Sequence, residues 1–284
     1  MSLIETHAIV VKLIPFRESD RIAWLVTRER GLVSAVVPGA RRSHKRFANV
    51  FDLANCVTLK LNMPRRGMAR ADSGKLVDGY WALSQSSLGL CAATHVIELL
   101  RRFSVEEHED AELFDVGVGA LRALARDGVQ PRLLRIFEGR LLGAVGLAPN
   151  LESCIACGRD IPADRDARYS FARSGVVCDR CVPGRDLFRL GAGARAALAR
   201  VLEAPIGTLY DLPMDKAEVD GLTALLPRQI EHHLGGPLVA LRFARSLVKP
   251  DQWSAPPPDD PAEHDAKEGE ALDASGESGD SERP

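Results

Sequence analysis

Short runs of apolar and β-branched residues, separated by turn residues, dominate the first eighty positions of the chain. These runs cover residues 7–16, 21–31, 31–42, 49–62 and, more weakly, 73–83. Each has the length and composition of a β-strand. No connection between them is long enough for the helix that joins parallel strands. Residues 1–80 are therefore predicted to form a five-stranded β-barrel, an OB-fold with an SH3-like barrel as the alternative.

The period of the apolar pattern changes to helical spacing near Tyr80. Helical segments are predicted over 83–103, 110–128, 131–149, 191–205, 216–236 and 237–248. Gly128 and Pro131 stand where a helix end and a first helical turn favour those residue types. Residues 81–250 are therefore predicted to form a mainly α-helical domain, which gives the chain an α+β fold.

Four of the six cysteines form two C-x-x-C pairs separated by twenty residues: Cys154, Cys157, Cys178 and Cys181. This spacing is typical of zinc-binding knuckles, because each pair delivers two thiolates to one side of a tetrahedron. Reduced cysteines without metal, a redox pair and an iron–sulfur cluster are the alternatives. Four thiolates leave no open coordination position, so one structural zinc ion is predicted, in a module at 151–185 inserted in the helical domain.

Charge is distributed unevenly along a chain of 284 residues with a net charge of −2. Residues 1–80 hold fourteen Lys and Arg against seven Asp and Glu, whereas residues 254–284 hold ten acids against two bases. The segment 251–284 lacks the apolar residues needed for a core and is predicted to be a disordered acidic tail. No apolar run reaches the length of a membrane span and no signal peptide is evident, so a cytoplasmic protein is expected.

Two basic clusters lie in predicted connections of the barrel. The first contains Arg41, Arg42, Lys45 and Arg46, and the second contains Arg65, Arg66 and Arg70. Solvated loop charge is the ordinary explanation, but two such loops on one small barrel favour contacts with nucleic-acid phosphates. The aromatic residues Trp24, Phe47, Phe51 and Trp81 are candidates to stack on bases, although each is more often a core residue.

No sequence feature supports catalysis. The chain has no phosphate-binding P-loop, no G-x-S-x-G and no H-E-x-x-H motif. His232 and His233 are adjacent on a predicted helix and point about 100° apart, so they cannot share a ligand. These two histidines and His95 are predicted to be surface or core residues, like Cys56 and Cys91 in the core.

The segments "HAIVVKLIPFRESD", "VFDLANCVTLKL" and "IEHHLG", together with the cysteine pairs, resemble the RecO family of bacterial DNA repair proteins. The resemblance covers about residues 4–248. It implies an OB-fold, a helical domain and a zinc module held by the four cysteines. It also implies a non-enzymatic recombination mediator that binds single- and double-stranded DNA and anneals complementary strands. The implied partners are RecR and the single-strand DNA-binding protein, with which the family loads RecA, and the implied location is the nucleoid.

The resemblance also assigns the loop after the third predicted strand, with Arg41, Arg42, Lys45 and Arg46, to DNA contact. It places a pocket for the tail of the single-strand binding protein in the helical domain, without identifying its residues. Two other functions stay open: a zinc-containing scaffold that docks proteins and whose basic loops are incidental, and a zinc-dependent nucleic-acid enzyme. The acidic tail is hypothesised to compete with DNA for the basic face.

Overall fold

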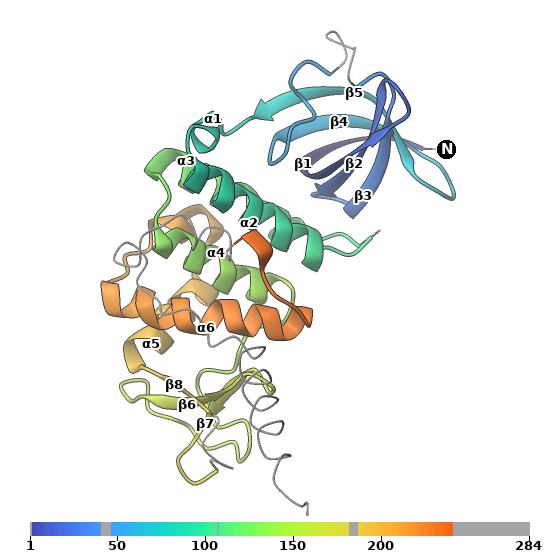
Figure 1. Cartoon of the computed structure of the whole chain (residues 1–284). Helices are drawn as coiled ribbons and strands as arrows, with labels where there is room; N and C mark the ends of the chain where they lie inside the picture. The colour runs from blue at the N-terminus through green and yellow to red at the C-terminus, as the bar shows by residue number, and fades with distance from the viewer. Residues whose placement is uncertain (1, 41–46, 107, 182–186, 241–284) are drawn as a thin grey trace, which may run out of the picture. The chain divides into compact units, whose positions relative to one another are not determined.

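The computed structural model describes residues 2–40, 47–106, 108–181 and 187–240. Strands come first and helices follow, which confirms the α+β class (Figure 1). None of the helices in these ranges is long and apolar enough to span a membrane. The basic cluster at 41–46, most of the helix predicted at 237–248 and the acidic tail lie outside the described residues.

Five strands form the N-terminal sheet: β1 (Ser2–Phe16), β2 (Asp20–Thr27), β3 (Gly31–Val37), β4 (Cys56–Met63) and β5 (Ala69–Asp78). They close into a barrel in the order β1-β2-β3-β5-β4. Closure is possible because the long strand β1 pairs with β4 through its first half and with β2 through its second half. A register shift after Val10 interrupts the β1–β2 ladder, and such irregularities increase strand bending. Only the β3–β5 pair is parallel.

The strand predicted over 49–62 begins only at Cys56. Before it, Phe47 and Phe51 are buried in the barrel interior, where their rings meet edge to face with centroids 5.2 Å apart. The side-chain amide of Asn55 donates hydrogen bonds to carbonyl groups of this turn. Apolar residues that the pattern assigns to a strand therefore form a turn that fills the barrel.

Six α-helices and one 3-10 helix make up the described helical region. They are α1 (Trp81–Ser84), α2 (Ser87–Phe103), α3 (Ala111–Asp127), α4 (Pro131–Ala144), α5 (Ala192–Glu203), η1 (Ile206–Asp211) and α6 (Lys216–Leu234). The single helix predicted over 83–103 is interrupted, because the Ser86 side chain caps α2 by accepting from the Gly89 N–H. Side chains of Asp110 and Asp215 cap α3 and α6 in the same way.

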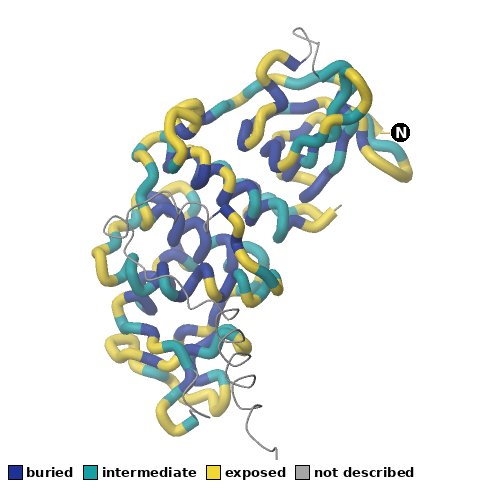
Figure 2. The backbone as a smooth tube through the Cα atoms, viewed as in Figure 1, coloured by how far each residue is buried: buried dark blue, intermediate teal, exposed yellow. Residues whose placement is uncertain are grey.

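Alternate side chains of the barrel strands enter two different cores. Val10 faces the barrel interior, whereas its neighbour Ile9 and the paired Val26 belong to the core formed with the helices. This follows from the two-residue period of a strand. A backbone hydrogen bond of 3.1 Å from Leu32 to Val105 lies at the same junction. Figure 2 shows the buried positions along both the strands and the helices.

Three ionisable side chains are buried together between α2 and α4. One carboxylate oxygen of Glu138 lies 2.8 Å from Nε2 of His95 and 2.8 Å from an Nη2 donor of Arg135. Their side chains are at most 1% exposed. Since a charge transferred from water to the protein interior requires a partner, the carboxylate compensates the guanidinium.

Replacing Glu138 by alanine is expected to reduce the free energy of unfolding by about 3–5 kcal/mol, because the Arg135 charge would stay buried without this carboxylate. Urea denaturation followed by circular dichroism measures the change. Glu5→Ala is the matched control, since Glu5 pairs with Lys60 at 3.7 Å on an exposed surface, and its loss should not change stability measurably. Equal stability of Glu138→Ala and the parent would contradict this interpretation.

The cysteine-bearing insertion contains a small antiparallel sheet in the order β7-β6-β8: β6 (Ala167–Ser170), β7 (Gly175–Val177) and β8 (Phe188–Leu190). β6 and β7 form a hairpin between the two cysteine pairs, and β8 pairs with the other edge of β6. Tyr169 is buried and its hydroxyl donates to the Gln229 side chain of α6 at 2.9 Å. The guanidinium of Arg228, also in α6, lies 4.6 Å from the Phe171 ring centroid. One face of the sheet is therefore packed on α6.

Candidate metal centre and nucleic-acid face

The four predicted metal ligands lie together. Their Sγ atoms are all within 4.8 Å of one another, and those of Cys157 and Cys178 are 3.7 Å apart. The first pair sits on a tight turn in which the Gly158 N–H donates to the Cys154 carbonyl at 2.8 Å. Gly158 has a φ of 73°, which explains why glycine suits this position. The backbone thus brings two cysteine pairs, twenty residues apart in sequence, around one point.

Electrostatics at this cluster fit a cation. Burial opposes ionisation of Cys154, but N–H groups of Cys178 and of the Ala156–Cys157 segment point at its sulfur and lower its pKa to about 6. Hydrogen bonds with the thiols of Cys157 and Cys178 raise the pKa of Cys181 to about 12. Neighbouring thiolates repel one another, so all four ionise together only when a positive ion lies among them.

The cluster can hold one metal ion through Cys154, Cys157, Cys178 and Cys181. Four thiolates complete a tetrahedral coordination shell and leave no position for a water molecule or a substrate. Such a site stabilises the surrounding chain. The first cysteine turn is attached directly to the small sheet, since the Ile155 N–H donates to the Val176 carbonyl of β7 at 3.0 Å.

A second candidate site lies on the outer face of the barrel. The register across β1, β2 and β3 aligns Ile14, Ile22 and Val36 in one row and Lys12, Trp24 and Ser34 in the next. The first row is half-exposed, and among the described residues it belongs to neither hydrophobic core. The row formed by Ile9, Val26 and Leu32, by contrast, packs on the helices. Apolar side chains therefore remain accessible beyond the part of the face that the helices cover.

Cations flank this half-exposed row. The ammonium of Lys12 lies 5.6 Å from the Trp24 ring centroid, and the Arg17 guanidinium lies 5.1 Å from the Phe16 ring centroid. Arg70 pairs with Val36 in the β3–β5 register, so it continues the apolar row on the next strand. Aromatic, apolar and positively charged groups on one surface are what a single nucleic-acid strand requires, because bases stack and phosphates pair with cations.

The predicted DNA-contact residues are only partly described. Arg65 and Arg66 are exposed in the β4–β5 connection, and Arg70 is exposed at the start of β5, 3.7 Å from Asp72. Arg41, Arg42, Lys45 and Arg46 lie outside the described residues. The beginning of their connection is held in place, since Asp20 accepts the Gly39 N–H at 2.8 Å and this bond lowers the pKa of Asp20.

The aromatic candidates divide into buried and accessible side chains. Phe47 and Phe51 are each 4% exposed inside the barrel, so stacking on bases is excluded for both by their burial. Trp81 is 57% exposed, and Trp24 is half-buried, with part of its side chain packed against the core formed with the helices. The sequence reading missed Lys12, whose position beside Trp24 depends on the strand register. In the sequence, only the alternation of apolar and polar residues in β1 and β2 indicated that Lys12 and Trp24 could lie on the same face of the barrel.

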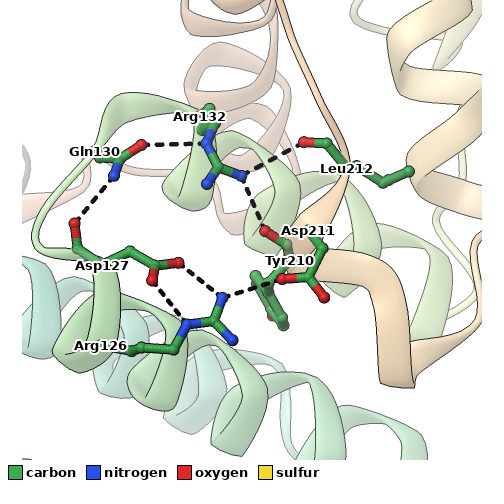
Figure 3. Close-up of polar contacts among 7 residues, drawn as sticks. All are labelled: Arg126, Asp127, Gln130, Arg132, Tyr210, Asp211 and Leu212. Atoms are coloured by element: carbon green, nitrogen blue, oxygen red, sulfur yellow. Dashed lines mark hydrogen bonds and ion pairs between the residues drawn. The ribbon is translucent and has the colours of Figure 1, made fainter.

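The helical region contains a pocket of about 280 Å³ between α3 and η1. Val118 and Ile206 contribute apolar surface, and Arg122 and Arg126 contribute positive charge. Figure 3 shows how part of the rim is fixed: Arg126 bridges Asp127 and Asp211 at 2.7 and 3.0 Å. Arg132 donates to the carbonyl oxygens of Tyr210 and Leu212, which holds η1 beside α4 (Figure 3).

Cys56, Cys91, His95, His232 and His233 lie in the core or at the surface, as predicted. Cys56, Cys91 and His95 are buried, as predicted for core residues. His232 is exposed and His233 is half-buried, where its Nε2 accepts from the Gln229 amide at 2.8 Å.

Two family models match the chain. One, described as the N-terminal region of recombination protein O, matches residues 1–80. The other, described as the C-terminal region of recombination protein O, matches residues 86–242. The second match alone covers more than half of the chain.

Curated relatives support the same assignment. The chain is 34% identical to a DNA repair protein RecO of Anaeromyxobacter dehalogenans, over 86% of this chain and 96% of that protein. It is 30% identical to DNA repair protein RecO of Geobacter sulfurreducens, over 87% of this chain and 100% of that protein. It is 29% identical to the Myxococcus xanthus protein of the same name, over 86% of this chain and 97% of that protein. The chain belongs to the RecO family of DNA repair proteins.

Proposed function

We propose that this protein is a non-enzymatic recombination mediator that binds single- and double-stranded DNA, anneals complementary strands and, with RecR, helps to load RecA. Family membership supports a role in recombinational repair. The observation that carries the more specific proposal is the outer face of the barrel, where a half-exposed apolar row adjoins Trp24 and lies between Lys12 and Arg70.

We propose that the barrel acts as an OB-fold whose β1–β3 face contacts bases and whose basic connections contact phosphates. In OB-folds the face of strands two and three and the adjoining loops bind oligonucleotides. Arg65 and Arg66 are exposed in the β4–β5 connection. Guanidinium groups bind phosphates of any sequence, so binding is expected to be independent of base sequence and to weaken with salt.

A binding titration at several salt concentrations tests this proposal. Fluorescence anisotropy with labelled single-stranded and duplex oligonucleotides of unrelated sequences should give affinities that fall steeply as salt increases. The apolar row should add affinity only for single strands, since stacked and paired bases in a duplex cannot reach it. Absence of DNA binding at low salt, with retained binding of partner proteins, would instead favour the zinc-containing scaffold.

Trp24→Ala is expected to weaken single-strand binding by about fivefold to 150-fold, because stacking of one base on an aromatic ring contributes about 1–3 kcal/mol. The salt dependence should hardly change, since no phosphate contact is lost. Leu90→Ala is the control, because Leu90 is an exposed apolar side chain of α2, outside the barrel. Thermal unfolding of both variants checks folding. Equal affinity of Trp24→Ala and the parent would remove Trp24 from the DNA site.

We propose zinc as the metal of the four-cysteine cluster, with a structural role. Zn²⁺ prefers four thiolates in tetrahedral geometry, and two cysteine pairs on tight turns supply them. Elemental analysis of protein purified without chelator tests the identity and predicts one zinc ion per chain.

We propose RecR and the single-strand DNA-binding protein as partners, and the pocket between α3 and η1 as the site for the tail of the latter. The pocket combines apolar walls with Arg122, whereas its other charged side chains Arg126, Asp211 and Asp115 are paired with neighbouring charges. Arg122 is therefore the group that suits a peptide with apolar and carboxylate groups. Calorimetry with that tail peptide should show weaker binding to Arg122→Glu than to the parent. Lys216→Glu, which also reverses one exposed charge, is the control. Equal affinity of both variants would exclude the pocket.

We also propose the following organisation: residues 1–80 and 81–250 as two domains, the module at 151–185 within the second, and a disordered acidic tail from 251. A mediator of DNA recombination is expected in the cytoplasm at the nucleoid. Limited proteolysis tests the boundaries, and fluorescence microscopy tests the location.

A further inference from the structure

The outer face of the small sheet in the cysteine module carries two neighbouring arginines. Arg168 of β6 and Arg189 of β8 are direct partners in the antiparallel register. Both are exposed, whereas the alternate residues Ala167, Tyr169 and Leu190 are buried. Directly opposed residues on neighbouring strands have their Cβ atoms about 5 Å apart. The two guanidinium groups therefore project from the same face, opposite to the one that packs on α6.

Only one of these two positive charges is balanced by a nearby carboxylate. Oδ2 of Asp166 accepts from Nε and Nη2 of Arg189 at 2.9 and 2.7 Å. Oδ1 of the same carboxylate accepts the Ala192 N–H at the start of α5, at 3.0 Å. Both oxygens are thus engaged. Arg168 takes part in none of the ion pairs between described residues.

Two opposed arginines that share a single carboxylate keep a net positive charge, so this arrangement favours an additional anion. The chain just before β6 does not supply a further anion for this pair, since the charge of Asp164 is offset by that of Arg165. The position of the pair is well defined, because β6 is fixed from behind by the Tyr169–Gln229 hydrogen bond. Arg168 can bind a phosphodiester through paired hydrogen bonds, and Nη1 of Arg189, which is not one of the donors to Asp166, can add a further one.

We infer that Arg168 and Arg189 form a second phosphate-binding site, which holds a DNA strand other than the one on the barrel. This inference rests on the proposed function and adds to it, because annealing requires one protein to hold two strands at once. The module then has two roles: its metal centre orders the sheet, and the outer face of that sheet binds the second strand.

The test is the stoichiometry of binding of a short single-stranded oligonucleotide of about ten nucleotides, within the length that one OB-fold contacts. Native mass spectrometry and anisotropy titration of the parent should show two oligonucleotides per protein. Arg168→Ala/Arg189→Ala should bind one, with the first dissociation constant unchanged and with annealing of two complementary strands slowed at least tenfold. The single variant Arg168→Ala keeps the Asp166–Arg189 pair and should also lose the second oligonucleotide.

Arg101→Ala/Lys216→Ala is the matched control, since it removes two positive charges elsewhere and should still bind two oligonucleotides. Zinc content and thermal unfolding confirm that the variants are folded. One oligonucleotide per parent protein, or two per double variant, would overturn the inference. So would an acidic polyglutamate peptide that binds this face when DNA does not, because the surface would then serve a protein. If neither the parent nor any of the variants binds even one oligonucleotide, the proposed function is refuted instead.

Discussion

Cys154→Ser is expected to abolish metal binding and to unfold the module around β6 and β7. Cys154 is the buried member of the cluster, and its sulfur receives backbone N–H groups from both cysteine turns. Metal binding in small zinc modules supplies an apparent free energy of about 10–16 kcal/mol, most of which is folding free energy. Without the metal, the module keeps only its contacts with α6 and with α5.

Elemental analysis, combined with hydrogen exchange of the backbone amides at 167–177, measures this effect. Metal content should fall to zero and these amides should exchange rapidly, while those of α2 and β1 stay protected. A chelator added to the parent protein should have the same effect. Cys91→Ser, a buried cysteine outside the cluster, should retain one metal ion per chain. A metal-loaded, protected Cys154→Ser protein would refute the metal centre.

Replacing Arg41, Arg42 and Arg46 together by alanine is expected to weaken DNA binding across unrelated sequences. Each phosphate contact with a single strand contributes about 0.7 to the slope of log affinity against log salt. Losing three contacts should therefore reduce that slope by about 2. It should also lower the affinity at about 0.1 M salt by about tenfold to a thousandfold.

Anisotropy titrations over a range of salt concentrations measure both quantities. Arg101→Ala/Lys216→Ala/Arg200→Ala removes the same charge from the helical region and controls for the change in net charge. The variant Arg65→Ala/Arg66→Ala compares the second basic connection with the first. If the triple variant binds with the affinity of the parent at low salt, the first connection does not contact DNA.

Elements defined by local patterns could be predicted from the sequence. The helices α3, α4 and α6 follow from apolar spacing with Asp110, Pro131 and Gly235 at their ends, because caps and periodicity act within a few residues. The cysteine cluster follows from two C-x-x-C pairs, since metal geometry restricts their spacing. Ser84 and Ser86 could be identified from the sequence as candidate N-caps of the helix at 83–103, but the separate turn α1 before Ser86 could not.

The sequence by itself therefore determined the α+β class, the four-cysteine cluster and the family, all of which depend on residue types at short or characteristic spacings. Only the tertiary structure decided which side chains share a surface. The alignment of Trp24 with Lys12, and of Arg168 with Arg189, depends on strand register. The burial of Phe47 and of Glu138 depends on what packs against each from distant segments. Such contacts join residues far apart in the chain, and no local pattern records them, because they are selected by closure of the barrel and by packing of the whole core.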